Sequence, residues 1–362
     1  MNVKQKLAIA VAAILLITVS ACTPFAQGTA PESYNLEISG STEAGFNSIT
    51  EGEIAQIVGF LASPDLEGRR SGTPENEIAG AFLAKSLEES SFAAFSNTFF
   101  QRFEISDLTD MDPYIVRVRL AQAGYTVELQ GRNVIGILRG VAKSDEYIVL
   151  AAHYDHVGVQ GGRLYPGADD NASGTAAVLE IAEAFGILAQ EGIRPQRSIV
   201  VAFMDAEEWG LWGSEYFVAH SPMPVEDIVA VVNLDMVGRN TPGTLWVIGS
   251  PDVDDFALRS PQLARITERT ANFMDFHLVL NGLRGREEQM FFRSDQAPFF
   301  LARPNDPIPV VFYTTGLHED YHMPTDTADK IDTLQVRNIA RFAFLVIWQI
   351  AELDAPPDYY TK

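Results

Sequence analysis

The 362-residue sequence has a single cysteine, so no disulfide can form within the chain. It is also short of basic residues, because 26 lysines and arginines stand against 48 aspartates and glutamates, a formal net charge of −22. Such a charge repels phosphate backbones, and we expect no nucleic-acid partner. Only six histidines occur. The content of 47% hydrophobic and 20% charged residues is typical of a folded protein rather than of a disordered one.

The first 48 residues are predicted to lie outside the folded domain. Two lysines precede an apolar run that is shorter than the roughly 20 residues of a membrane-spanning helix. The run ends in "VSAC", which resembles the lipobox of bacterial lipoproteins, so 1–21 is predicted to be a lipoprotein signal peptide. An ordinary secretory signal with a chance cysteine is the alternative. Residues 22–48, rich in Pro, Thr, Ser, Gly and Ala without helical or strand periodicity, are predicted to be a flexible spacer.

This segment also predicts where the protein resides. Cleavage after Ala21 leaves Cys22 as the lipidated first residue of the mature chain. We therefore expect an exported lipoprotein anchored to a membrane and facing the periplasm or the cell exterior. In a Gram-negative organism, Thr23 after the cysteine favours the outer membrane.

Beyond the spacer, helical and strand patterns alternate along the chain. Helices are predicted over 53–63, 76–89, 172–190, 210–220, 261–273 and 333–353. Strands are predicted over 114–120, 125–130, 133–140, 147–153, 198–204, 228–236, 244–250 and 308–314. This alternation predicts the α/β class, with a single domain over 49–355 and a tail over 356–362. Its central sheet should be mostly parallel, with helices on both faces.

Side chains able to bind a metal follow the ends of the predicted strands. They are His153, Asp155, Asp169, Asp170, Glu207, Glu208, Asp235, His318 and His322. Each group has a simpler explanation when taken alone, such as a buried histidine or an aspartate that caps a helix. Ligands in such sheets bind beyond the carboxyl ends of the strands. The conjunction of all these groups at strand ends therefore indicates a functional site.

The motifs "HYDH", "GADDNASG", "DAEEWG", "NLDMVG" and "YHMPTDT", in this order, resemble the co-catalytic dinuclear zinc aminopeptidases. That family also contains glutamate carboxypeptidase and the glutaminyl cyclases. The resemblance covers essentially the whole domain and implies the zinc-peptidase (phosphorylase/hydrolase-like) fold with two Zn²⁺ per chain. It implies that His153 and Asp235 hold one zinc, that Glu208 and His322 hold the other, and that Asp170 bridges both. Zinc takes nitrogen and oxygen ligands of these kinds.

The resemblance also implies catalytic roles. Glu207 would be the general base for a metal-bridging water, Asp155 would orient His153, and Tyr321 would hydrogen-bond the developing oxyanion. The implied activity is that of an exported, lipid-anchored metalloaminopeptidase acting on peptides with a free N-terminus.

Other residues of the motifs are not assigned to the metal ions or to catalysis. His156 and His318 are expected to have structural roles or to act behind the metal ligands. In "RSDQAPF", Gln296 stands where the family usually has histidine, which leaves the role of that position open. Phe291 and Phe292 line a substrate pocket or pack in the core.

Two kinds of alternative remain. One is a relative of the same fold, a carboxypeptidase, dipeptidase or glutaminyl cyclase, although cyclases typically work with one zinc. The other is a scaffold or binding lipoprotein that has lost catalysis. Loss of ligands would mark such a protein, whereas here the five ligands and the base are all present.

Overall fold

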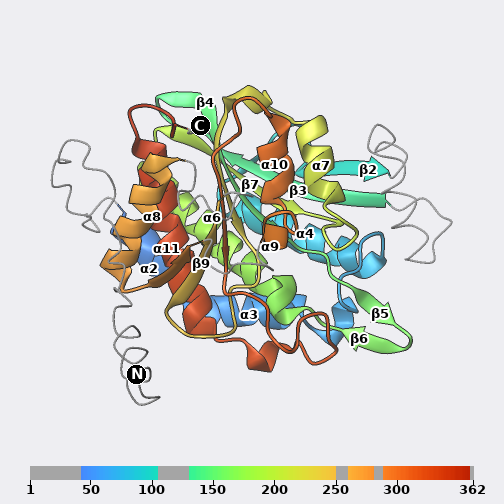
Figure 1. The fold of residues 1–362 in the computed structure, drawn as a ribbon. Helices are drawn as coiled ribbons and strands as arrows, with labels where there is room; N and C mark the ends of the chain where they lie inside the picture. The colour runs from blue at the N-terminus through green and yellow to red at the C-terminus, as the bar shows by residue number, and fades with distance from the viewer. Residues whose placement is uncertain (1–41, 105–129, 250–259, 281–287, 359–362) are drawn as a thin grey trace, which may run out of the picture. The chain divides into compact units, whose positions relative to one another are not determined.

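A computed structural model describes residues 42–104, 130–249, 260–280 and 288–358 (Figure 1). The predicted signal peptide, Cys22 and most of the predicted spacer lie outside these ranges. So do the strand predicted over 114–120 and all but the last residue of the strand predicted over 125–130. The described residues belong to one compact unit of the chain.

A nine-stranded sheet forms the centre of this unit, in the order β1-β3-β7-β4-β8-β11-β9-β10, with β2 paired to β3. The four strands β7, β4, β8 and β11 run parallel, and antiparallel pairs flank them. The strands are β1 (Ala93–Ala94), β2 (Phe100–Glu104), β3 (Gln130–Leu138), β4 (Lys143–His153), β7 (Arg197–Met204), β8 (Ile228–Leu234), β9 (Thr244–Ile248), β10 (His277–Leu280) and β11 (Val310–Thr314). A separate hairpin joins β5 (Gly158–Gln160) to β6 (Arg163–Tyr165).

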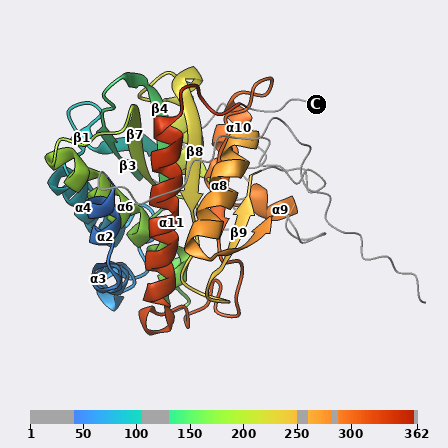
Figure 2. The ribbon, with the colours of Figure 1, turned by 90° about the vertical axis from the view of Figure 1, so that its left-hand side faces the viewer.

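Helices cover both faces of the sheet. Figure 2 shows α11 lying along the sheet between α6 and α8. Helices α7 and α10 lie side by side (Figure 1), and their buried side chains belong to one apolar cluster with side chains of the sheet. The helices are α2 (Glu43–Ser48), α3 (Glu51–Leu61), α4 (Pro74–Glu89), α6 (Gly174–Gln190), α7 (Trp212–Ala219), α8 (Pro261–Met274), α9 (Glu288–Phe291), α10 (Gln296–Ala302) and α11 (Thr333–Glu352). Short helical turns occur at Pro64–Leu66, Ala168–Ser173, Val225–Asp227 and Ala328–Lys330.

The apolar run of β4 follows from this layering. Every residue from Tyr147 to His153 is buried, because β7 and β8 lie on either side and helices cover both faces. The predicted α/β fold with a mostly parallel central sheet and helices on both faces is confirmed. The predicted helices over 53–63, 76–89, 172–190, 210–220, 261–273 and 333–353 are all present, with ends displaced by a few residues.

One helix differs from the expectation of a spacer without periodicity over 22–48. Residues Glu43–Ser48 form the six-residue helix α2, which packs against α6 and α11. Its Gly45 is buried, and a Cβ there would lie 2.9 Å from the carbonyl oxygen of Ala184. A helix this short has less than two turns of pattern, and tertiary packing rather than its own periodicity stabilises it.

Among the described residues, one helix is long and apolar enough to cross a membrane. It spans Ala168–Gln190, but 83% of its most apolar window is buried inside the protein. It is therefore the central helix of the core rather than a membrane anchor.

Replacing two helical glycines with alanine is expected to have opposite effects on stability. A Cβ on Gly186 in α6 would lie 2.2 Å from the carbonyl oxygen of Ser90, whereas one on Gly59 in α3 would meet nothing within 4 Å. We expect Gly186→Ala to lower the free energy of unfolding by about 1–3 kcal/mol through overpacking. Gly59→Ala should raise it by about 0.5–1 kcal/mol, because alanine restricts the unfolded chain and favours the helix. Urea unfolding of both variants measures the two effects, and a loss of stability in Gly59→Ala would contradict the packing described.

Candidate metal centre and active site

The register of the sheet brings the strand ends to one level. His153, the last residue of β4, pairs with Met204 at the end of β7. Ala151 pairs with Asn233 on the other side, so Asp235 just beyond β8 lies level with His153. The loops that carry the predicted ligands therefore meet at the carboxyl edge of the parallel strands, where such sheets bind ligands.

The first group of side chains surrounds His153. Its Nε2 lies 3.3 Å from Oδ1 of Asp170 and 3.4 Å from Oδ1 of Asp235. Asp170 lies in the kinked turn Ala168–Ser173 that precedes α6. The backbone N–H of Asp170 donates to Asp326, which also accepts from the N–H of the preceding residue. This capping carboxylate holds the Asp170 loop against the strand ends.

The second group surrounds His322, which lies in the loop after β11. Its Nε2 lies 3.0 Å from Oδ2 of Asp170 and 3.0 Å from Oε2 of Glu208. The two oxygens of the Asp170 carboxylate thus face two different histidines, Oδ1 toward His153 and Oδ2 toward His322. A carboxylate placed in this way can bridge two metal ions.

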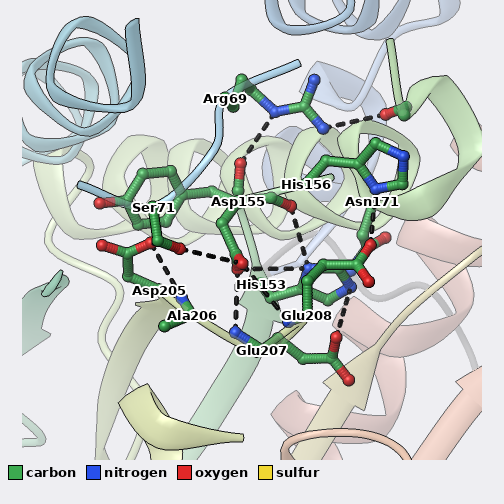
Figure 3. A network of polar contacts seen from close by, with 12 residues as sticks. Arg69, Ser71, His153, Asp155, His156, Asn171, Asp205, Ala206, Glu207 and Glu208 are labelled. Carbon is green, nitrogen blue, oxygen red and sulfur yellow. Dashed lines mark hydrogen bonds and ion pairs between the residues drawn. The ribbon is translucent and has the colours of Figure 1, made fainter. Parts of the chain in front are cut away.

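The loop after β7 is held by two buried aspartates. Asp155 accepts hydrogen bonds from the backbone N–H groups of Glu207 (3.1 Å) and Glu208 (3.4 Å). Ser71 lies between the carboxylates of Asp155 (3.1 Å) and Asp205 (2.8 Å), and Figure 3 shows this network. Burial, with Asp155 adding to it, raises the pKa of Asp205 to about 7. Ser71 and Asp205 were not predicted from the sequence, although Asp205 directly precedes the "AEE" motif.

Asp155 contacts His153 with both its backbone and its side chain. The Nδ1 atom of His153 lies 3.2 Å from the backbone carbonyl oxygen of Asp155 and 3.6 Å from its Oδ1. The Asp155 carboxylate also holds the loop that carries Glu207 and Glu208.

These residues fit zinc. Among the described residues, His153 Nε2 and Asp235 Oδ1 are buried and have no hydrogen-bond partner. Burial alone would lower the pKa of His153, but the carboxylates around it raise this pKa well above its ordinary value. In the same way Asp170 and Glu208 raise the pKa of His322 to about 10 against the effect of burial. The cluster favours positive charge, and its nitrogen and oxygen atoms are those that zinc prefers.

Glu207 lies beside this cluster. Its Oε2 is 4.0 Å from Nε2 of His153, and 10% of its side chain is exposed. Burial raises its pKa well above the ordinary value, and the nearby carboxylates of Glu208 and Asp235 raise it further, against the effect of His153. The raised pKa makes Glu207 a stronger base than an ordinary carboxylate, which suits a group that accepts a proton and returns it.

A small pocket opens beside the cluster. It is lined by Asp170, Glu207, Asp235, Met236, Met290, Arg293, Phe312, Thr314, Leu317 and Tyr321. A larger cavity of about 600 Å³ lies between α3, α4 and α6. We assign the site to the small pocket, because the residues able to bind a metal border it.

Arg293 and Tyr321 interact at this pocket. Arg293 Nη2 donates to the Tyr321 hydroxyl at 2.9 Å, and the Tyr321 ring stacks on His322 with ring centroids 3.9 Å apart. Burial, together with nearby carboxylates, raises the pKa of Tyr321, so its hydroxyl keeps its proton. No role was predicted for Arg293 from the sequence, although this residue is the first of the "RSDQAPF" motif.

The rest of that motif lies behind Asp235. Ser294 donates to Oδ2 of Asp235 at 2.8 Å, and Asn233 donates to both Ser294 and Gln296. Of the two phenylalanines predicted for a pocket or the core, Phe291 packs in the core, and 46% of Phe292 is exposed. Gln296 therefore supports the Asp235 side of the site through Asn233.

The two remaining histidines of the motifs are both close to the cluster. His318 Nε2 lies 3.1 Å from Oδ2 of Asp169, the neighbour of Asp170. His156 lies against Glu208, with Nδ1 2.6 Å from Oε1. His318 thus acts behind the predicted ligands, whereas His156 contacts one of them directly.

Arg69 links several of these loops through hydrogen bonds from its guanidinium group. It is fully buried and donates to the carbonyl oxygens of Leu61, Tyr154, Pro166 and Gly167. The last two precede the Asp170 loop. Burial lowers the pKa of Arg69 to about 10, so the guanidinium stays charged at neutral pH.

We expect Arg69→Met to lower the free energy of unfolding by about 3–5 kcal/mol, because several buried carbonyl groups lose their donor. Urea unfolding measures this loss. The matched control is Arg163→Met, which removes an exposed arginine from β6 and should change stability by less than about 0.5 kcal/mol. Equal stability of the two variants would contradict the role given to Arg69.

The comparisons with known proteins agree with this geometry. A glutamate carboxypeptidase of Zea mays, described as probable, is 38% identical over 204 residues, which cover 54% of this chain and 26% of that protein. An aminopeptidase of Pseudomonas aeruginosa is 34% identical over 154 residues, which cover 42% of this chain and 26% of that protein. The chain thus matches about a quarter of the length of these relatives.

The fold is also found among solved structures. The aminopeptidase from Aneurinibacillus sp. strain AM-1 has a TM-score of 0.64 at 16% identity, covering 89% of this chain and 98% of that one. The model of peptidase family M28 matches residues 133–347, which is more than half of the 362 residues and includes every predicted metal ligand. The chain belongs to peptidase family M28.

Proposed function

We propose that the protein is a zinc-dependent aminopeptidase that binds two Zn²⁺ and removes N-terminal residues from peptides. The single observation that carries this proposal is the Asp170 carboxylate, whose two oxygens face His153 and His322 at 3.3 and 3.0 Å. His153 and Asp235 would hold one ion, and Glu208 and His322 the other, with Asp170 shared. When bound, the two ions would lower the pKa of a water molecule and polarise the carbonyl group of the substrate.

Glu207 would move the proton in this reaction. Its carboxylate borders the pocket and lies beside His153, so it can accept a proton from the attacking water. Because its pKa is raised, the protonated form can then deliver this proton to the leaving amine. Asp155 would keep Glu207 in place by accepting a hydrogen bond from the backbone N–H of Glu207.

Tyr321 would stabilise the developing oxyanion. Arg293 donates to the Tyr321 oxygen, which leaves the hydroxyl hydrogen available to a substrate in the pocket. The raised pKa of Tyr321 keeps this hydrogen in place over the range in which peptidases act.

The lining of the pocket favours a substrate with a free N-terminus. Asp170, Glu207 and Asp235 present carboxylates to the pocket, and an α-amino group is a cation near neutral pH. Met236 and Met290 are among the apolar residues that would contact the first side chain of the peptide.

A panel of aminoacyl-p-nitroanilides, each with its N-acetylated counterpart, tests the proposal. We expect release of p-nitroaniline from the free-amine substrates, sensitivity to a chelator, and little release from the acetylated ones. Release of C-terminal residues from acylated peptides instead would favour a carboxypeptidase, cleavage of dipeptides alone a dipeptidase, and cyclisation of N-terminal glutamine a glutaminyl cyclase. None of these activities, together with no bound metal, would favour a scaffold or binding lipoprotein.

We also propose that the protein is exported and anchored through lipid on Cys22, in the outer membrane if the organism is Gram-negative. Support comes from the sequence, where an apolar run precedes "VSAC". Cys22→Ser should move the protein from the membrane fraction to the soluble fraction on cell fractionation. Retention of this variant in the membrane fraction would contradict the anchor.

A further inference from the structure

A third histidine lies inside the candidate metal centre. His156 is fully buried, and its Nδ1 lies 2.6 Å from Oε1 of Glu208 and 3.9 Å from Oδ2 of Asp170. These two carboxylates are the ones assigned to the second zinc. His156, Asp170 and Glu208 also offer three ligand atoms within 4.8 Å of one another. His156 therefore contributes either as a ligand or by holding one.

The distances separate these two roles. The carboxylate of Glu208 is divided between two imidazoles, with Oε1 2.6 Å from His156 and Oε2 3.0 Å from His322. Zinc binds nitrogen and oxygen at about 2.0–2.2 Å, so two ligands at a tetrahedral angle lie about 3.4 Å apart. The 2.6 Å contact is much shorter than this and is an ion pair between the imidazole and the carboxylate. It therefore joins His156 to the carboxylate rather than to a shared ion.

The contact between His156 and Glu208 compensates both side chains for their burial. His156 Nδ1 and Glu208 Oε1 are both buried, and they form an ion pair at 2.6 Å. This close contact offsets part of the cost of removing the two atoms from water.

The ring of His156 has little room to move. Gly167, at a φ of +62°, lies so close that a Cβ there would be 2.4 Å from Cγ of His156. The backbone N–H of His156 donates to the Arg69 carbonyl oxygen at 3.3 Å. On its other side the ring meets His322 edge-on, with centroids 5.7 Å apart. A ring fixed in this way can hold a carboxylate in one orientation.

We propose that His156 is a positioning residue of the second metal site, which holds Oε1 of Glu208 through Nδ1–H so that Oε2 is presented to the metal. This inference rests on the proposed function, because it assumes that Glu208 and His322 bind zinc. Such partners behind a metal ligand typically account for about 10- to 100-fold in metal affinity.

Zinc binding by the purified protein tests the proposal. Wild type, His156→Ala and His156→Asn compete for zinc with a colorimetric chelator, and His220→Ala is the control, because His220 is exposed and stacks on Tyr216. We expect one zinc of His156→Ala to bind about 10- to 100-fold more weakly and the other to bind as in the wild type. His156→Asn should restore most of the affinity, because its side-chain amide can donate from the position of Nδ1.

Each outcome decides the proposal. Wild-type affinity for both ions in His156→Ala would overturn it, and so would equal weakening in His156→Ala and His156→Asn, which would indicate direct ligation. Circular dichroism checks that each variant folds. If His156→Ala does not fold, His156→Asn is compared with the wild type instead. A loss of zinc affinity of 10-fold or more in His156→Asn would then overturn the proposal. A wild-type protein that binds no zinc would overturn the proposed function as well, whereas two zinc ions unaffected by His156 would overturn only this inference.

Discussion

Replacing Glu207 with glutamine is expected to lower kcat by about 10²- to 10⁴-fold while zinc binding stays close to that of the wild type. The amide keeps the shape of the side chain but cannot accept a proton. Glu207 is not among the predicted ligands. The hydrogen bond from its backbone N–H to Asp155 is unchanged by the substitution. Steady-state kinetics with an aminoacyl-p-nitroanilide, together with zinc analysis of the same sample, measures both effects.

The control for this experiment is Glu319→Gln, which removes a carboxylate that is exposed in the same loop as His318. It should leave kcat within about twofold, because an exposed charge contributes little at this distance. A Glu207→Gln enzyme with wild-type kcat would show that another group accepts the proton. Loss of zinc in this variant would instead indicate that Glu207 is a ligand.

Asp170→Asn should abolish zinc binding at both sites rather than at one. The carboxylate faces His153 with Oδ1 and His322 with Oδ2, so a single change affects both groups of side chains. An amide is neutral and offers only one acceptor oxygen. We expect a loss of affinity beyond the roughly 10- to 100-fold caused by losing a partner behind a ligand. Activity should fall to the background rate, and metal analysis after dialysis measures the occupancy.

The matched control is Asp329→Asn, because Asp329 is exposed in the helical turn Ala328–Lys330. This variant should bind zinc like the wild type. If Asp170→Asn keeps one tightly bound zinc, the two metal sites do not share this carboxylate, and the bridging role is wrong.

Much of the fold could be predicted because the parallel strands are buried on both faces. Such strands appear in the sequence as continuous apolar runs, as in β4 and β7. The prediction failed at α2, whose six residues carry too little pattern to identify a helix. The strand β10 was also missed, because its four residues extend the sheet edge beside β9 without a clear alternation.

The site could be predicted as far as residues carry a local motif. His153, Asp170, Glu207, Glu208, Asp235 and His322 stand in motifs at strand ends, and the register of the sheet brings them together. Ser71 and Arg69 could not be found in this way. They come from a loop more than 80 residues before Asp155, and only the folded chain places them beneath the metal centre. For His156 the sequence predicted a structural role or one behind the metal ligands, and its contact with Glu208 identifies the ligand that it touches.

A zinc titration of the metal-free protein tests the central claim most directly. Zinc is removed with a chelator and returned in steps, while bound metal and hydrolysis of an aminoacyl-p-nitroanilide are measured in the same samples. We expect up to two ions to bind per chain, with full activity at that occupancy and none in the metal-free protein. Hydrolysis that persists without metal would contradict the claim, and so would two bound ions without hydrolysis of any free-amine substrate.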